Sequence, residues 1–329
     1  MLENSANYFN LYDIEEVKCN LCGTFNSEIL EDCIVTIDSY SFSFKMVKCP
    51  ICGLVYLNPR LNESGLKAFY EAYFKKPKGG DYDIEQINSS PHLMDRFLGE
   101  IEKRIAKGKL LDVGCGRGSF LNRAKERGWY GWGVEFSEIA ALEARELGLN
   151  VQIGDLTQVK FPSSYFDVVT LFNVIEHVRD PFATISEVHR VLKHTGLLVI
   201  RAPNIDWLEF PPVGVLRNIK KRVKGFLDKN YYFSTTGILN MFMVQHLYYF
   251  SRKTLRLLLE KVGFKIEWIT TRDPWHFQTS LKALKRREYF QSAYFLCMAI
   301  LSMTDQGSTV VIYARKDKRY SNYDLKCSR

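Results

Sequence analysis

The chain has 329 residues, of which 46% are hydrophobic and 25% charged, with a formal net charge of +8. This suits a soluble protein with one large domain and smaller attachments. The basic excess is compatible with nucleic acid, a sugar nucleotide or an anionic lipid surface, and separates none of them. No stretch approaches the roughly 20 apolar residues that span a bilayer, and no leader pattern precedes the first motif, so we expect a cytoplasmic location.

Two closely spaced cysteine pairs lie near the start of the chain, Cys19 with Cys22 and Cys49 with Cys52. A glycine follows each pair, so a tight turn can direct both thiolates at one ion. The other four cysteines are scattered, which favours metal binding in a reducing compartment over two disulfides or four unrelated thiols. The spacing therefore predicts a structural four-cysteine zinc site, with no open position for a catalytic water.

Residues 61–108 follow this module and predict a helical linker. Apolar side chains recur at helical spacing over residues 63–74, Leu66 and Tyr70 among them, and again over 91–105. Between these helices, residues 75–83 are polar, contain glycine and have tyrosines beside them. We expect this segment to be either a lid over a cofactor pocket or a solvated linker.

Strands and helices alternate from residue 109 onward. Apolar runs predict strands at 109–112, 131–135, 150–155, 166–173 and 196–203, with helices between most of them. A helix over 251–262 and strands near 264–269 and 308–315 follow. This order predicts an open, doubly wound α/β sheet. Residues 205–245 and 275–303 are too long for ordinary connections, and their basic runs suit acceptor recognition, a membrane surface or simply solvent.

Polar residues end four of the predicted strands. The turn after the first strand also has glycines at alternate positions, which let a ligand approach the backbone. Ligands of such sheets bind beyond the carboxyl ends of the strands, so carboxylates gathered there indicate a cationic or hydroxyl-rich ligand. The strand-end residues are Asp112, Glu135, Asp155 and Asn173, and the glycines are Gly114, Gly116 and Gly118.

A nicotinamide-dependent dehydrogenase is an alternative use of this fold. Its dinucleotide fingerprint needs a third glycine where this chain has Ser119. Asp112 would also bring a negative charge close to the pyrophosphate. Both observations disfavour the dinucleotide.

Four motifs resemble those of the class I S-adenosylmethionine-dependent methyltransferases. They are Leu-Leu-Asp-Val-Gly-Cys-Gly-Arg-Gly (110–118), Gly-Val-Glu-Phe-Ser (133–137), Gly-Asp-Leu (154–156) and Phe-Asp-Val-Val-Thr-Leu-Phe-Asn-Val-Ile-Glu-His-Val (166–178). The Cys-x-x-Cys-Gly motifs with Asn-Pro-Arg, Ala-Pro-Asn and His-Leu-Tyr-Tyr-Phe-Ser resemble a bacterial subgroup with an N-terminal zinc module. Members of that subgroup are often associated with sugar, cell-surface glycan or lipid modification.

The resemblance implies a seven-stranded Rossmann-like catalytic domain over 109–329, behind a zinc-ribbon-like module over 1–60. It implies that Asp112, Gly114 and Gly116 approach the methionine part of the cofactor. It further implies that Glu135 binds the ribose and that Asp155 and Leu156 bind the adenine, beside Phe136. Cys115, Gly118 and Asn173 complete the cofactor site that we expect. An acidic, glycine-lined pocket suits a sulfonium cation better than a phosphate.

His177 is the candidate general base, because it follows the fourth strand at the mouth of the crevice and imidazole titrates near working pH. Glu176 is its neighbour, and His246 is a second candidate. A structural role for His177 in the loop is the alternative. Some similar methyltransferases hold a divalent metal with Glu-x-x-Glu-His and a further histidine, but Asn173 replaces the first carboxylate here, which weakens a hard-cation site.

The acceptor that we expect is a hydroxyl or carbon of a small molecule, sugar, glycan or lipid-linked precursor, with peripheral membrane contact as an option. Methylators of base amino groups have Asn-Pro-Pro-Tyr or Asp-Pro-Pro-Tyr after the fourth strand, and Asn173-Val-Ile-Glu does not match. Nucleic acid is therefore disfavoured. An RNA-directed methyltransferase and a non-catalytic RNA-binding module remain alternatives because of the zinc module and the basic runs.

Overall fold

The computed structural model describes residues 13–37, 40–75, 91–209, 245–271, 296, 300, 307–317 and 319. The expected lid or linker at 76–83 and most of the two insertions lie outside these residues. Among the helices that are described, none is both long enough and apolar enough to cross a bilayer.

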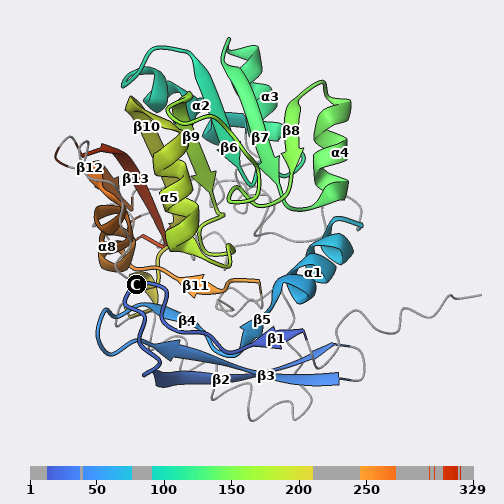
Figure 1. The fold of residues 1–329 in the computed structure, drawn as a ribbon, viewed down its shortest axis with the longest axis vertical. Coiled ribbons are helices and arrows are strands. Elements are labelled where there is room, and N and C mark those ends of the chain that lie inside the picture. The colour runs from blue at the N-terminus through green and yellow to red at the C-terminus, as the bar shows by residue number, and fades with distance from the viewer. Residues whose placement is uncertain are drawn as a thin grey trace, which may run out of the picture.

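A seven-stranded, mostly parallel sheet forms the centre of the fold (Figure 1). The strand order is β12-β13-β10-β9-β6-β7-β8, and β13 is antiparallel to both of its neighbours. This confirms the predicted Rossmann-like sheet. Its strands are β6 (Lys109–Val113), β7 (Tyr130–Glu135), β8 (Asn150–Ile153), β9 (Phe166–Phe172), β10 (Leu192–Pro203), β12 (Phe264–Thr270) and β13 (Thr309–Lys316).

The winding of the sheet reverses beside β6. The chain moves outward from β6 through β7 to β8, then returns to place β9 on the other side of β6. Ligands of open α/β sheets bind beyond the carboxyl ends of the strands at such a reversal. The glycine turn that follows β6 lies at this point.

Helices cover both faces of the sheet and define two apolar cores. Side chains of α5 (Pro181–Val191) and α8 (Arg252–Val262) belong to one core, and those of α2 (Pro91–Glu102), α3 (Ser119–Glu126) and α4 (Glu138–Glu146) belong to the other. The middle strands pack between the two, which explains why β9 reads as an almost continuous apolar run. A short helix, α6 (Asp206–Glu209), follows β10.

Local capping fixes where the helices begin. Ser137 accepts the Ala140 N–H at the start of α4. Asp180 accepts the Ala183 N–H at the start of α5, with Pro181 at the first helical position. The start of α5 therefore directly follows the segment that contains His177.

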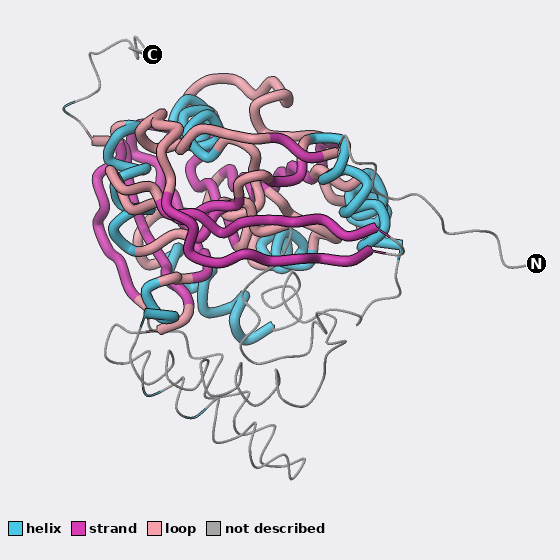
Figure 2. Tube along the Cα trace, turned by 90° about the horizontal axis from the view of Figure 1, so that it is seen from below, coloured by secondary structure: helices cyan, strands magenta, loops and turns pink. Residues whose placement is uncertain are grey.

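The N-terminal strands lie below the carboxyl ends of the large sheet (Figure 1). Strands β2 (Glu28–Ile37), β3 (Tyr40–Lys48) and β4 (Val55–Leu57) form an antiparallel sheet, while β1 (Ile14–Glu15) pairs with β5 (Arg60–Leu61). Seen from below, the long β2–β3 ribbon crosses this side of the molecule (Figure 2). Helix α1 (Glu63–Lys75) connects this region to the side of α4.

A fourth strand of the N-terminal sheet comes from a distant part of the chain. Strand β11 (Tyr248–Tyr249) pairs with β4, through Tyr248 with Tyr56 and Tyr249 with Val55. The cysteine pairs also belong to the same apolar core as α5 and α8. The N-terminal region and the large sheet therefore share both a strand pairing and a core.

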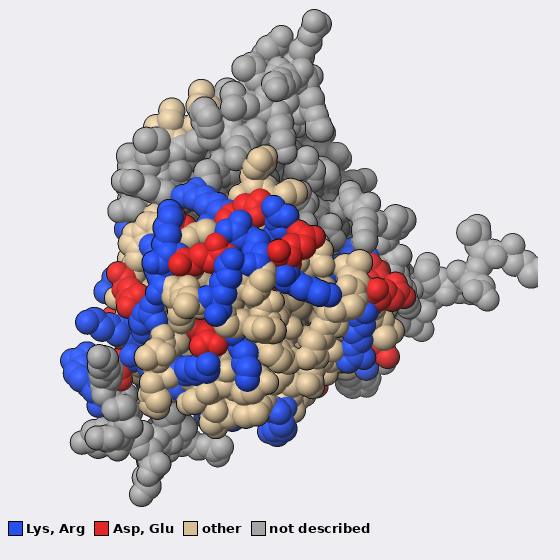
Figure 3. All heavy atoms as spheres, turned by 90° about the horizontal axis from the view of Figure 1, so that it is seen from above, with Lys and Arg blue, Asp and Glu red and all other residues tan. Residues whose placement is uncertain are grey.

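The opposite end of the molecule carries charges of both signs, with basic side chains over much of it and acidic ones among them (Figure 3). Arg123 and Arg127 both contact Asp95, at 2.8 and 3.4 Å, and Arg127 also contacts Glu102 at 2.5 Å. Such pairing reduces the positive field around these two arginines.

Candidate functional site

A cavity of about 830 Å³ lies between the carboxyl ends of the parallel strands and the N-terminal region. Its volume lies within the range of small-molecule pockets, about 300–1,000 Å³. The predicted site residues that line it are Gly114, Gly116, Glu135, Phe136, Asp155, Leu156, Asn173 and His177. The structure therefore brings most of the predicted cofactor residues and the predicted base to one cavity.

The glycine turn places backbone donors against Glu135. One carboxylate oxygen accepts the N–H of Gly116 and the other accepts the N–H of Ser137, both at 2.8 Å. Gly114 has a φ of 67°, and a Cβ there would lie 2.4 Å from Val174. Burial raises the pKa of Glu135, although the backbone donors oppose this shift. The carboxylate is thus fixed in direction at the edge of the cavity.

Asp112 lies behind this edge rather than in the lining. Its carboxylate accepts the Thr170 hydroxyl at 2.6 Å. Burial raises the pKa of Asp112 to about 7, and the nearby charge of Glu135 adds to the shift. Cys115 is buried in the core, and Gly118 lies at the start of α3 with a φ of 80°. Neither residue is among those that line the cavity.

The other end of the cofactor side is formed by the turn after β8. Asp155 accepts both the N–H and the hydroxyl of Thr157, at 2.8 and 2.7 Å. Leu156 is 1% exposed and presents an apolar surface to the cavity. A carboxylate beside apolar groups suits a flat, amino-bearing ring.

Glu176, His177 and His246 converge although His246 lies far away in the sequence. One ligand atom from each lies within 4.8 Å of the others. The two imidazole rings are 4.6 Å apart, and His177 Nε2 is 3.9 Å from Glu176 Oε1. His177 Nδ1 is 2.9 Å from the carbonyl oxygen of Gln245, so Nδ1 is the protonated nitrogen and Nε2 carries the lone pair.

Burial governs the protonation of this cluster, and it contradicts the expectation that His177 titrates near working pH. It lowers the pKa of His177 to about 4, lowers the pKa of His246 well below its ordinary value, and raises that of Glu176 to about 8. Arg201 opposes the shift of Glu176 through its charge. Neither oxygen of this buried carboxylate has a hydrogen-bond partner among the described residues, which indicates room for a further cation or donor.

Asn173 holds a strained position just before the cluster. Its φ is 55°, in the left-handed region, and its side-chain oxygen accepts a hydrogen bond from Arg201 at 2.5 Å. The sequence did not indicate Arg201, because it reads as one residue of a buried strand. An arginine inside an otherwise apolar run was the available signal.

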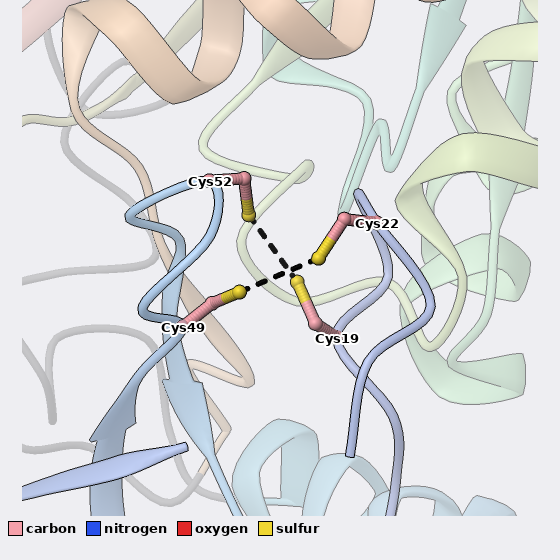
Figure 4. A group of neighbouring side chains, drawn as sticks. All are labelled: Cys19, Cys22, Cys49 and Cys52. Atoms are coloured by element: carbon pink, nitrogen blue, oxygen red, sulfur yellow. Dashed lines mark hydrogen bonds between the residues drawn. The ribbon is translucent and has the colours of Figure 1, made fainter. Parts of the chain in front are cut away.

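The four cysteines converge as their spacing predicted (Figure 4). Cys19 Sγ lies 3.4 Å from Cys52 Sγ, and Cys22 Sγ lies 3.4 Å from Cys49 Sγ. These distances exceed a disulfide bond of about 2.05 Å. They approach the edge of about 3.8 Å expected for a tetrahedron with Zn–S bonds of about 2.3 Å. The donor set therefore fits a zinc ion.

The first cysteine turn also contacts the start of α5, which follows His177. Asn20 donates to Asp180 at 2.9 Å, and its side-chain oxygen accepts the Phe182 N–H at 2.9 Å. Asn20, Arg60 and Tyr70 line the cavity, yet sequence reasoning assigned none of them to the site. Only the helical spacing of Tyr70 with Leu66 and Phe74 could have indicated a shared face.

Comparisons with known proteins agree with this geometry. A family model described as a methyltransferase domain matches residues 84–268, which is more than half of the chain. A ubiquinone biosynthesis O-methyltransferase of Saccharophagus degradans is 35% identical over 138 residues, covering 39% of this chain and 58% of that protein. Its counterpart from Histophilus somni is 30% identical over 139 residues, covering 39% and 57%. The chain thus spans little more than half the length of these relatives.

Solved structures support the fold. A phosphoethanolamine N-methyltransferase 2 from Haemonchus contortus, in complex with phosphomonomethylethanolamine and S-adenosylhomocysteine, is similar with a TM-score of 0.53 and 15% identity. The match covers 84% of this chain and 64% of that one. With the family match, the seven-stranded sheet and the acidic, glycine-lined cavity, the chain belongs to the class I S-adenosylmethionine-dependent methyltransferases.

Proposed function

We propose that this enzyme methylates a hydroxyl group, and that the acceptor is a small molecule such as a sugar or a lipid-linked precursor. The observation that carries the proposal is the single cavity that runs from Glu135 to His177. The names of the relatives, which are O-methyltransferases, support a hydroxyl acceptor over a carbon.

On the donor side, Glu135 accepts the ribose hydroxyls and Asp155 with Leu156 binds the adenine. Gly114 and Gly116 let the methionine part approach the backbone, with Asp112 supplying negative charge from behind. The bound donor supplies a methyl group on a sulfonium, which is already an activated leaving group. The protein has to align the acceptor and remove its proton.

The acceptor side is formed by both parts of the fold. Tyr248 and Leu66 give it apolar walls, and Lys18 and Arg60 come from the N-terminal region. A small acceptor with an apolar body and a polar end suits these walls. We therefore assign acceptor recognition partly to the cysteine module over residues 1–60.

We assign the general base to His177. Its Nδ1–H is held by the Gln245 carbonyl, so Nε2 can accept a proton from an acceptor hydroxyl in the cavity. Glu176 lies 3.9 Å from Nε2, and because burial raises its pKa to about 8, it stabilises the imidazolium by charge only above about that pH. His246 packs against the ring of His177 and orients it.

A divalent cation is a second candidate for the same cluster. The convergence of Glu176, His177 and His246 within 4.8 Å favours it, as does the unpaired carboxylate. A cation there would polarise the acceptor oxygen. Asn173 adds no ligand in the described conformation, because its side-chain oxygen accepts from Arg201. The two roles compete for His177 Nε2, so they exclude each other.

We propose a structural zinc ion for the four cysteines. Gly23 and Gly53 have positive φ and donate to the carbonyls of Cys19 and Cys49, which closes each cysteine turn. Burial raises the pKa of Cys19 and Cys52, whereas backbone N–H groups and the neighbouring thiols lower the pKa of Cys49 to about 7 against the effect of burial. Such donors stabilise thiolates around a metal.

Labelling identifies the acceptor. The purified enzyme is incubated with methyl-labelled S-adenosylmethionine and separate lipid, glycan, small-molecule and RNA fractions of the host. We expect label in a small-molecule or lipid fraction. Label in RNA alone would overturn the acceptor assignment.

A further inference from the structure

Tyr70 lies where the donor side and the catalytic side of the cavity meet. Its ring centroid is 6.1 Å from that of Phe136, which follows Glu135, and 6.3 Å from that of His177. Leu66 and Phe74, one helical turn away on either side, line the same cavity. One face of α1 therefore forms a wall of the site, with Tyr70 at its middle.

Helix α1 contacts both the glycine turn on the donor side and the loop after His177. At its C-terminal end, Arg117 of the glycine turn donates to the Phe74 carbonyl at 3.1 Å and lies 5.3 Å from the Phe74 ring centroid. At its N-terminal end, Glu63 accepts from Arg179, two residues after His177, at 2.5 Å. The position of Tyr70 is thus fixed relative to both the donor turn and the catalytic loop.

The surroundings of Tyr70 carry negative charge. Burial raises the pKa of Tyr70 well above its ordinary value, and the carboxylates of Glu135 and Glu176 add to the shift. The phenol therefore stays neutral. A neutral aromatic ring that lines the cavity beside Phe136, the residue after Glu135, attracts a cation by its ring face.

We propose that the ring of Tyr70 covers the sulfonium of the bound donor, an inference that rests on the proposed function. The methyl group leaves sulfur with its bond to the acceptor oxygen forming, and the sulfonium becomes a neutral thioether. The contact is therefore strong with S-adenosylmethionine and weak with S-adenosylhomocysteine. Tyr70 thus favours donor over product at the same site.

Calorimetric titration with the two nucleosides tests this without any acceptor. We expect Tyr70→Phe to bind both nucleosides within about twofold of the wild type, because the ring face remains. Tyr70→Leu should weaken S-adenosylmethionine about fivefold or more, in the range of a cation–π contact, and change S-adenosylhomocysteine less than twofold. Phe69→Leu is the matched control, since Phe69 lies on α1 beside Tyr70 but is not among the lining residues.

Fluorinated phenylalanines at position 70 give a second measurement that keeps the shape of the ring. Each added fluorine weakens the negative ring face, so S-adenosylmethionine affinity should fall stepwise while S-adenosylhomocysteine affinity stays constant. Equal losses for both nucleosides, or none, would overturn the inference and leave the cofactor assignment intact. Failure of the wild type to bind either nucleoside would overturn both.

Discussion

Asn20, which lies inside the first cysteine turn, donates a hydrogen bond to Asp180, the residue that caps helix α5. The same side chain accepts the Phe182 N–H, so it makes two hydrogen bonds with the start of α5. The cysteine centre is thereby tied to the loop that carries His177.

Removing the two hydrogen bonds of Asn20 should destabilise the contact between the first cysteine turn and α5. We expect Asn20→Ala to lower the free energy of unfolding by about 1–2 kcal/mol, because two hydrogen bonds at a helix start are lost. Urea unfolding followed by circular dichroism measures the change. Asn122→Ala is the control, because the side chain of Asn122 bonds only the exposed Glu126 among the interactions described. This variant should change stability by less than about 0.5 kcal/mol.

Metal analysis tests the cysteine centre. Protein purified under reducing conditions should hold zinc at one equivalent per chain, and Cys49→Ser should lose it and unfold at a lower temperature. Cys115→Ala should keep its zinc, because this thiol is buried in the other core. Zinc-free wild-type protein of unchanged stability would contradict the assignment.

The role of Glu135 can be measured by cofactor binding. Glu135→Gln should weaken S-adenosylhomocysteine by about tenfold or more, because hydrogen bonds to a charged acceptor are lost. Glu138→Gln, at an exposed position in the first turn of α4, should have little effect. Unchanged affinity in Glu135→Gln would show that the ribose binds elsewhere.

Asp112 predicts a pH dependence of donor binding. Its pKa is raised to about 7 by burial, so the carboxyl is mostly protonated at pH 6 and ionised at pH 8. The ionised form attracts the cationic donor, so affinity for S-adenosylmethionine should rise by up to about tenfold over this interval. Asp112→Asn should flatten the profile. A profile of the same slope in that variant would assign the titration to another group.

The same raised pKa affects the ligand-free fold with the opposite sign. A carboxyl group that is harder to ionise when folded stabilises the protein at low pH, and this contribution falls as pH rises from about 4 to 7. Asp112→Asn should reduce that fall, which melting curves across the interval would detect.

The cluster of Glu176, His177 and His246 could act through a general base or through a bound metal ion, and the two roles can be distinguished. If His177 is the base, His177→Ala should lower kcat by about 100-fold or more, while Glu176→Gln leaves the metal content at the zinc of the cysteines. Elemental analysis of the wild type and Glu176→Gln decides between the two. A second metal equivalent that disappears in Glu176→Gln would replace the base with a bound cation.

The regular part of the fold was predictable because its signals are local. Apolar runs located the strands within a few residues. The strand β11 was not predictable, because two residues carry no periodicity and Tyr248 is held by pairing with Tyr56.

The residues of the candidate site also differ in how far the sequence could predict them. The residues at strand ends follow from topology, so Glu135 and Asp155 could be named from the sequence. The contact of His246 with His177 depends on the path of the chain between them, and Tyr70 depends on how α1 docks. Such tertiary contacts leave no trace in local spacing.

The pairing of β11 with β4 has a consequence for biosynthesis. During translation the cysteine turns and the β2–β3 ribbon leave the ribosome early, but the outer strand of their sheet is completed only after residue 249 has been made. Until then, the edge of β4 offers unpaired backbone groups to other chains. Slow synthesis or zinc shortage would therefore prolong an aggregation-prone stage, and yield should depend on both.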